Sequence, residues 1–541
     1  MVSTWLQAFG RTKPLPKDLH LNEHTSSLKR CLTLFDLICY GVGCSVGAGV
    51  YSLIGIGANI TGPSISISFL ISGIACIFTS LTYSEFAARV PITGSAYSFV
   101  YVTFGELAAW LIGWNLMLGY GISAAGIARS WASYIAIFMR QWGVHIPREW
   151  IAIDAWGLSC SALAAALIVV LSVILLAGVH ESAKFNMVVT ALNVAVLLLV
   201  IAVGSTEVDV SNWEPFAPEG AHGIMQGAGV IFFAYLGFDM VACLAEEVPN
   251  PQTNVPRGII GSLLISMSIY IGVSLVITGM APAAILGTDV PIVNAFDFHQ
   301  LTWVTHVVSF GSMFGLTTAA FTCLMGQPRI FYQMAKDGLL PDCLSAVHAS
   351  TQVPYWSTIL TGVGVATFAY FFDLNVLANV ISCGTLMVFT FVNAGLLVLR
   401  YDATSTSPSN HSLGHWLSTV SFPIRLVWFV LASFATCLTI NLDVPVAAQL
   451  SLGATVLATY CWIHNGTLHP VCSSTVFVCP WVPAVPCLGI FSNTYMMTSL
   501  PLLAWTGVGI WMCVGILLYG CFGMHHSKLG STRNVESLPL I

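Results

Sequence analysis

Long apolar runs, separated by short breaks that contain charges, glycine or proline, follow one another along nearly the whole chain. The stretch from Ile259 to Thr288, for example, contains no Asp, Glu, Lys or Arg. About 20 apolar residues allow a helix to cross the hydrocarbon core of a membrane. The pattern therefore predicts an all-α polytopic membrane protein. About fourteen spans are expected, at residues 33–57, 63–89, 105–138, 155–178, 182–204, 223–245, 258–280, 299–326, 355–373, 375–400, 423–441, 445–463, 476–499 and 501–523.

The first and sixth predicted spans are interrupted. The first contains four glycines between residues 41 and 49, and each glycine costs a helix roughly 1 kcal/mol relative to alanine. The sixth contains Gly237, with an acid, Asp239, in mid-membrane two residues later. The breaks lie about 190 residues, or five spans, apart, which predicts a five-plus-five inverted-repeat transporter. Close helix packing through small residues is the alternative, but it does not explain Asp239 or the five-span period.

The basic residues predict the orientation of the chain. If the N-terminus is cytoplasmic, 14 of the 17 Lys and Arg residues fall on the cytoplasmic side, as the positive-inside rule requires. Only Arg140 and Arg148 fall outside, and Arg129 lies within the third span. Both termini are therefore expected in the cytoplasm. The predicted parts are an N-terminal cytoplasmic segment (1–32), a transport core of ten spans (33–400), a cytoplasmic loop (401–422), four additional transmembrane helices (423–523) and a cytoplasmic tail (524–541).

Composition excludes other classes of protein. With 56% hydrophobic and 7% charged residues, the chain lacks the polar surface of a water-soluble domain. A formal net charge of −6 argues against nucleic acid as a partner. Most of the 16 cysteines lie in apolar runs, where a thiol acts as a small hydrophobe. The loose group of Cys472, Cys479 and Cys487 with two histidines does not have zinc-site spacing. We therefore expect no metal, no cofactor and no enzymatic activity.

Several motifs resemble those of the cationic amino acid transporters, within the amino acid–polyamine–organocation superfamily. The resemblance extends over nearly the whole chain, and the motifs together are far more specific than any one of them. It implies a LeuT-like five-plus-five core with about four extra C-terminal helices. The matching segments are LKRCL (28–32), GVGCSVGAGVY (41–51), TYSEFAARVPITGSAY (82–97), GWNLMLGY (113–120), FFAYLGFDMVACLAEEVPNPQTNVPRGI (232–259) and GSMFGLTTAAFTCLMGQPRIFYQMAKDGLLP (311–341).

The chain departs from the family pattern at two places. The cytoplasmic loop after the tenth span is shorter than in many animal members. Position 193 is Asn, where some bacterial relatives place a lysine implicated in proton coupling. This second departure favours a facilitator over a proton symporter.

The two breaks contain the candidate substrate-binding residues. Backbone amides at the start of a half-helix can bind an α-carboxylate, and glycine lets the main chain approach the ligand. Free carbonyls near Ser45 and in 234–236 would accept from the α-ammonium. The resemblance implies the same assignment and adds Phe233 as a candidate gate, Tyr235, and Leu316 and Thr317 as side-chain contacts; plain core packing is the alternative for these four. The full candidate set is Ser45, Val46, Gly47, Ala48, Gly49, Phe233, Ala234, Tyr235, Leu236, Gly237, Asp239, Leu316 and Thr317.

The ionisable residues within the spans require an explanation, because an intramembrane charge costs at least about 2.5 kcal/mol. Asp239 either caps free amides after the break or reads the substrate's cation. Glu85 lies one helical turn before Arg89, and this i,i+4 pair accounts for both residues structurally. The resemblance makes Glu85 important for transport. We therefore expect Glu85 and Arg89 to form part of an inner gate, with Asn193 at the coupling position.

These inferences predict a sodium-independent, alternating-access transporter of arginine, lysine and ornithine, driven by the membrane potential. Sodium independence is implied by the family. A proton-coupled carrier of neutral amino acids on the same fold and a non-transporting amino-acid sensor remain as alternatives. No disulfide-linked heavy chain is expected, because the outer loop 139–154 has no cysteine. The expected partners are therefore an amino acid substrate and the lipid bilayer.

The tail ends in an acidic dileucine pattern formed by Glu536, Leu540 and Ile541. On a cytoplasmic tail such a pattern can act as a sorting signal that a receptor recognises. Chance occurrence is the alternative. We expect a multi-pass membrane protein. The plasma membrane is the favoured location, and an endosomal or lysosomal membrane is the second choice.

Overall fold

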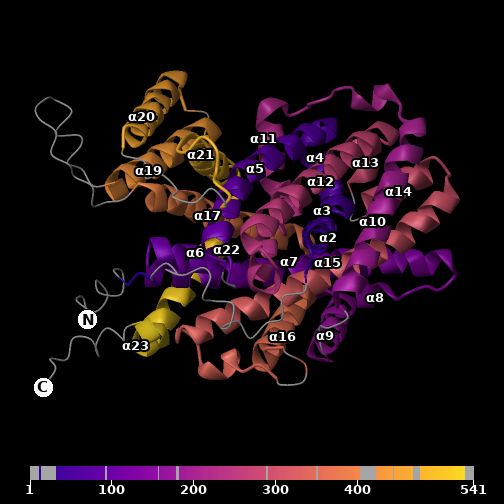
Figure 1. The fold of residues 1–541 in the computed structure, drawn as a ribbon. Helices are drawn as coiled ribbons and strands as arrows, with labels where there is room; N and C mark the ends of the chain where they lie inside the picture. The colour runs from indigo at the N-terminus through magenta and orange to yellow at the C-terminus, as the bar shows by residue number, and fades with distance from the viewer. Residues whose placement is uncertain are drawn as a thin grey trace, which may run out of the picture.

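The computed structural model describes residues 11–13, 32–91, 94–155, 158–177, 182–287, 290–348, 351, 353–401, 422–442, 444–466 and 476–529. Within these ranges the chain is a bundle of long helices with one small hairpin (Figure 1). The longer helices are α2 (Leu34–Ser45), α4 (Leu53–Thr61), α5 (Ile65–Arg89), α6 (Ala96–Thr103), α7 (Glu106–Gln141), α9 (Ala162–Ala177), α10 (Ser182–Gly204), α11 (Gly220–Ile231), α12 (Pro251–Met280), α14 (Pro291–Phe298), α15 (Thr302–Lys336), α16 (Tyr355–Phe371), α17 (Leu374–Arg400), α19 (Phe422–Asn441), α20 (Val446–His464), α21 (Ala484–Thr498) and α22 (Leu502–Leu518).

Each predicted span contains one of these helices. Ten helical segments in the described part of the chain are long and apolar enough to cross a membrane, and α2 and α9 are shorter apolar helices. The start of the fourth predicted span differs, because Ile153–Ala155 (β1) and Leu158–Cys160 (β2) form an antiparallel hairpin and α9 begins only at Ala162. Five short helices lie outside the predicted spans: α6 and α14, together with α8 (Arg148–Ile151), α13 (Ala283–Leu286) and α23 (Met524–His526). The short helix α3 (Ala48–Tyr51) lies within the first predicted span, after its break.

The packing of the helices places α2 at the centre of the bundle. The helix begins with a capping box, in which the Asp36 amide donates to Thr33 Oγ1 at 3.3 Å and the Thr33 amide donates to Asp36 Oδ2 at 2.9 Å. It then contacts α10, α12 and α15. Helix α7 packs along α15, and α5 packs along α12. These helices therefore surround the first interrupted span.

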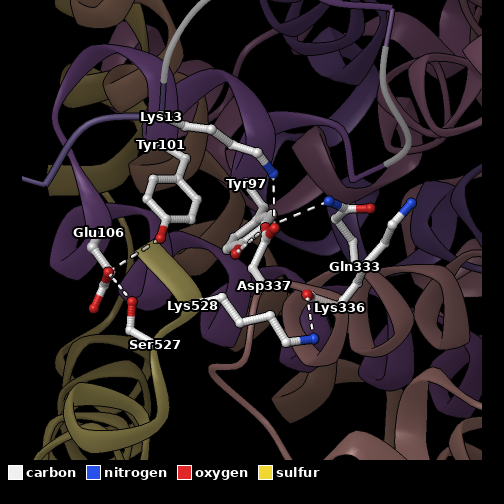
Figure 2. A network of polar contacts seen from close by, with 9 residues as sticks. All are labelled: Lys13, Tyr97, Tyr101, Glu106, Gln333, Lys336, Asp337, Ser527 and Lys528. Carbon is white, nitrogen blue, oxygen red and sulfur yellow. Dashed lines mark hydrogen bonds and ion pairs between the residues drawn. The ribbon is translucent and has the colours of Figure 1, made fainter. Parts of the chain in front are cut away.

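Residues 11–13 and 527–528 lie at one corner of the bundle, beside α6 and the start of α7 (Figure 2). Residues 11–13 lie along this corner, where the Lys13 amide donates to the Tyr101 carbonyl at 3.2 Å and the Glu106 amide donates to the Arg11 carbonyl at 2.9 Å. We call this network the terminal clasp. Its side chains are Arg11, Lys13, Tyr97, Tyr101, Glu106, Gln333, Asp337, Tyr519, Ser527 and Lys528.

Two carboxylates hold the terminal clasp together. The fully buried Glu106 accepts hydroxyl hydrogen bonds from Tyr101 at 3.1 Å, Tyr519 at 2.8 Å and Ser527 at 2.5 Å. Asp337, just after α15, pairs with Lys13 Nζ at 2.8 Å and accepts from the Tyr97 hydroxyl. Lys13 and Ser527 are thus held by carboxylates at the start of α7 and the end of α15 (Figure 2).

Candidate substrate site

The first and sixth spans break where the glycine pattern predicts. Helix α2 ends at Ser45 and α3 begins at Ala48, so the first break is Val46–Gly47. In the sixth span α11 continues into the 3₁₀ helix η5 (Phe232–Tyr235), and the 3₁₀ helix η6 (Asp239–Glu247) follows after a gap. Gly237 in this gap has a φ of 131°, a value that side-chain-bearing residues rarely adopt.

The two breaks face each other at van der Waals distance. A Cβ on Gly49 would lie 2.4 Å from the Cβ of Ala234, and a Cβ on Gly237 would lie 2.7 Å from Ser45 Oγ. Both distances are too short for carbon, so glycine is needed on each side. The breaks therefore form one unit of facing main chain, although 190 residues separate them in sequence.

The structure distinguishes among the amides expected to bind an α-carboxylate. The Val46 amide donates to the Val42 carbonyl at 2.7 Å, and the Gly47 amide donates to the Ser45 carbonyl at 2.8 Å. Ala48 and Gly49 open α3, and first-turn amides have no acceptor within their own helix. These two amides are the ones left for a ligand.

Tyr270, on α12, links the carbonyl groups of the two breaks. Its hydroxyl lies 2.7 Å from the Ser45 carbonyl oxygen and 2.8 Å from that of Ala234. A phenol has one proton to donate, so it cannot satisfy both acceptors fully. Acceptor capacity therefore remains where an α-ammonium would bind. Sequence reasoning missed this residue, and its only signal is a tyrosine in the middle of an uncharged run.

A narrow cavity of about 10 Å³, about the size of one water molecule, opens at the breaks. Six of the predicted binding residues line it: Ser45, Gly47, Ala48, Gly49, Phe233 and Leu236. Five further lining residues were not predicted: Cys44, Ser123, Ile127, Met240 and Cys323. The lining therefore combines main chain and small polar groups with apolar and sulfur-bearing side chains.

Other predicted binding residues support the site without lining the cavity. The Tyr235 hydroxyl donates to the Phe69 carbonyl at 2.7 Å, and its ring packs edge-on against Tyr270. On α15, Leu316 is fully buried, while the Thr317 hydroxyl donates to the Met313 carbonyl within the same helix at 2.8 Å. Val46, Ala234, Gly237 and Asp239 are also absent from the lining.

Asn193, on α10, holds the first break in place. Its amide nitrogen donates to the Val46 carbonyl at 2.9 Å, and its side-chain oxygen accepts from the Tyr51 hydroxyl. Tyr134 in turn donates to the Tyr51 carbonyl at 2.6 Å. The contact to the break is thus made by a neutral group that neither gains nor loses a proton at physiological pH.

Asp239 is buried and its carboxylate is engaged by the protein. Oδ1 accepts from the Gly237 amide at 3.1 Å, and Oδ2 accepts from the Tyr120 hydroxyl at 2.8 Å. The first contact holds the main chain of the gap, and the second joins it to α7, whereas the start of η6 has no side-chain cap. The choice between capping and cation recognition stays a prediction.

Asp239→Asn is expected to retain uptake of both lysine and a neutral amino acid, because the Asn oxygen can accept from the Gly237 amide and its NH2 group can donate to the Tyr120 oxygen. Asp239→Ala should lose both activities, since Gly237 and Tyr120 would lose their acceptor. Uptake into proteoliposomes measures the difference. Selective loss of lysine uptake in the Asn variant would instead assign cation recognition to this carboxylate.

Glu85 lies in a buried ionic cluster at the end of α5. Its Oε1 is 2.6 Å from an Arg89 terminal nitrogen and 2.8 Å from Arg400 Nε. Its Oε2 accepts from Arg400 at 3.2 Å and from the Cys479 amide at 2.8 Å. The sequence predicts only the pair with Arg89. The cluster therefore joins α5 to the end of α17 and to the segment before α21.

The acidic dileucine residues Glu536, Leu540 and Ile541 lie outside the described residues, as do most of the predicted cytoplasmic segments 1–32 and 401–422.

Comparison with known sequences identifies the relatives of this chain. Residues 32–463 match the family described as amino acid permease, and residues 477–527 match the family described as the C-terminus of AA_permease. A methylthioribose transporter of Bacillus subtilis is 35% identical over 97% of this chain and 100% of its own length. The chloroplastic cationic amino acid transporter 9 of Arabidopsis thaliana is 36% identical, over 97% of this chain and 95% of its own. The branched-chain amino acid permease BcaP of Bacillus subtilis is 32% identical, with coverages of 93% and 95%.

Proposed function

The chain belongs to the amino acid permease family, and we propose that it is a sodium-independent, alternating-access transporter that binds L-amino acids at the two facing helix breaks. The observation that carries this proposal is the pairing of free amides with incompletely satisfied carbonyls at one cavity. The Ala48 and Gly49 amides would bind the α-carboxylate. The Ser45 and Ala234 carbonyls, which share the Tyr270 hydroxyl, would accept from the α-ammonium.

We propose arginine, lysine and ornithine as the first candidate substrates. The resemblance of the sequence motifs supports this choice, as does the relative named as a cationic amino acid transporter. A monovalent cation gains about 2.3 kcal/mol per 100 mV of membrane potential. Roughly 60 mV therefore supplies about 1.4 kcal/mol, which corresponds to about tenfold accumulation. No coupled ion is needed for this facilitated transport, and the neutral Asn193 at the first break is consistent with it.

A neutral amino acid is the second candidate, and the lining of the cavity favours it. The side chains there include Cys44, Ile127, Met240 and Cys323, and the described lining contains no Asp or Glu. The side chain of leucine would match this surface without burying a charge. A relative is named as a branched-chain amino acid permease.

Labelled arginine uptake into proteoliposomes that contain only this protein is expected to persist when choline replaces sodium and to rise when the interior is made negative. A cation moved by a facilitator follows the potential, whereas a sensor would move nothing. Leucine and alanine are the competitors to include. Strict sodium dependence would contradict the facilitator, and uptake of leucine that ignores voltage would favour the neutral substrate.

We propose the Glu85 cluster as part of an inner gate, because one carboxylate joins three separate segments at the end of the bundle. Opening on this side would have to separate at least one of these contacts.

Replacement of Leu540 and Ile541 by alanine is expected to move a tagged protein from internal vesicles toward the plasma membrane, because adaptor proteins would no longer bind the tail. Surface arginine uptake should rise without a change in its apparent KM. Microscopy together with surface biotinylation measures both, and Ser537→Ala in the same tail is the matched control. Identical distributions would leave the dileucine pattern a coincidence.

A further inference from the structure

Three sulfur atoms from three different elements meet at the cavity. Cys44 lies in α2, Met240 in η6 and Cys323 in α15. Cys44 Sγ is 3.1 Å from Met240 Sδ and 3.8 Å from Cys323 Sγ. All three side chains are at most 3% exposed, and all three line the cavity. We call them the sulfur site.

The spacing of the two thiols is that of ligands to one ion. Two sulfurs bonded to the same metal at about 2.3 Å in tetrahedral geometry lie about 3.8 Å apart, which is the observed separation of Cys44 and Cys323. The Met240 thioether needs only a small rotation to move from contact with Cys44 into a third ligand position, because methionine has three rotatable bonds. We propose that the sulfur site binds one soft monovalent cation such as Cu(I) or Ag(I).

The donor set determines which cations fit. Thiolate and thioether sulfur are soft ligands that select Cu(I), whereas Mg²⁺ and Ca²⁺ need oxygen ligands. Within the described residues, no group of three or more His, Cys, Asp and Glu side chains could hold a metal, so harder divalent ions have no comparable place there.

Charge balance also favours a monovalent ion. On binding, one of the two thiols loses its proton to water and forms a metal–thiolate bond. The other thiol and the thioether each donate a lone pair and remain neutral. The bound unit, one thiolate and one monovalent cation, has no net charge, and a neutral unit avoids the desolvation cost of an isolated buried charge.

Occupation of the sulfur site would affect substrate binding directly. The ion would join α2 to α15 at the same cavity that Ala48 and Gly49 line. The amino acid and the ion would then weaken each other's binding by the same factor, because the coupling between two ligands is reciprocal.

Competition between the purified full-length protein and the Cu(I) chelator bicinchoninate tests the proposal. The background for this measurement replaces by serine the exposed Cys343, Cys461, Cys513 and Cys521, together with Cys31 and Cys472 outside the described residues. This background is expected to withdraw one equivalent of Cu(I), and X-ray absorption should give a shell of sulfur alone. Cys44→Ser and Cys323→Ser should each lose that equivalent, and Met240→Leu should weaken it.

Cys76→Ser is the matched control, since Cys76 is a fully buried thiol of α5 that does not line the cavity. The thermal unfolding midpoint shows whether each variant is folded. If a serine variant fails to fold, weaker Cu(I) binding by the conservative Met240→Leu variant still tests the site. Equal Cu(I) binding by the background, Cys44→Ser and Cys323→Ser would overturn the proposal. Because the measurement needs no transport, its result is independent of whether the substrate is an amino acid.

Discussion

Arginine uptake is expected to fall to the level of empty liposomes when Gly47 is replaced by leucine. The new side chain would start at the wall of the cavity, beside the amides of Ala48 and Gly49. Even its first carbon would lie 2.8 Å from the Cβ of Ala319 and 3.7 Å from Ile127. Radiolabel uptake measures activity, and size-exclusion chromatography shows whether the variant remains folded.

A pair of smaller substitutions separates packing from binding. Gly47→Ala brings one methyl group against Ala319, and adding Ala319→Gly removes that contact while leaving the methyl at the cavity. Uptake should stay low in the double variant if the space at residue 47 belongs to the substrate. Full recovery would mean that Gly47 serves helix packing only.

Glu85→Ala is expected to lower the free energy of unfolding by about 3–5 kcal/mol, because it leaves two guanidinium groups without their buried carboxylate. The thermal unfolding midpoint in detergent is the measurement. Glu85→Ala combined with Arg400→Met should recover most of the loss, since removing both partners leaves fewer unpaired charges. A midpoint equal to that of the wild type would contradict the buried ionic cluster.

Glu85→Asp separates stability from gating, because it keeps the charge and shortens the side chain by one methylene group. If Glu85 also serves as a gate, uptake should fall more than the unfolding midpoint does.

The helices and both breaks could be predicted because their signals are local. Apolar run length identifies a membrane helix, and the cost of glycine in a helix identifies the breaks at Val46–Gly47 and around Gly237. The hairpin at 153–160 and the short helices contain too few residues to be identified from the length of an apolar run.

The partners of the predicted residues could not be derived in the same way. Glu85 meets Arg400, which lies 315 positions along the chain, and the two break carbonyls share a hydroxyl from Tyr270. Cys323 joins the cavity from α15. Periodicity gives the exposed and buried faces of one helix but not which other helix packs there. The partner of Asp239 could not be derived for the same reason, since Tyr120 is on α7.

The terminal clasp has a consequence for the order in which the protein is made. Glu106 precedes its hydroxyl partner Ser527 by 421 residues, and translation proceeds at about 5–20 residues per second. For roughly 20–80 s the newly made α7 therefore carries a carboxylate whose hydroxyl donors from Tyr519 and Ser527 have not yet been synthesised. A chain that terminates before residue 519 would keep the Tyr101 and Arg11 partners of this carboxylate but would permanently lack two of its three hydroxyl donors, and with them the contacts that join α7 to the last helices.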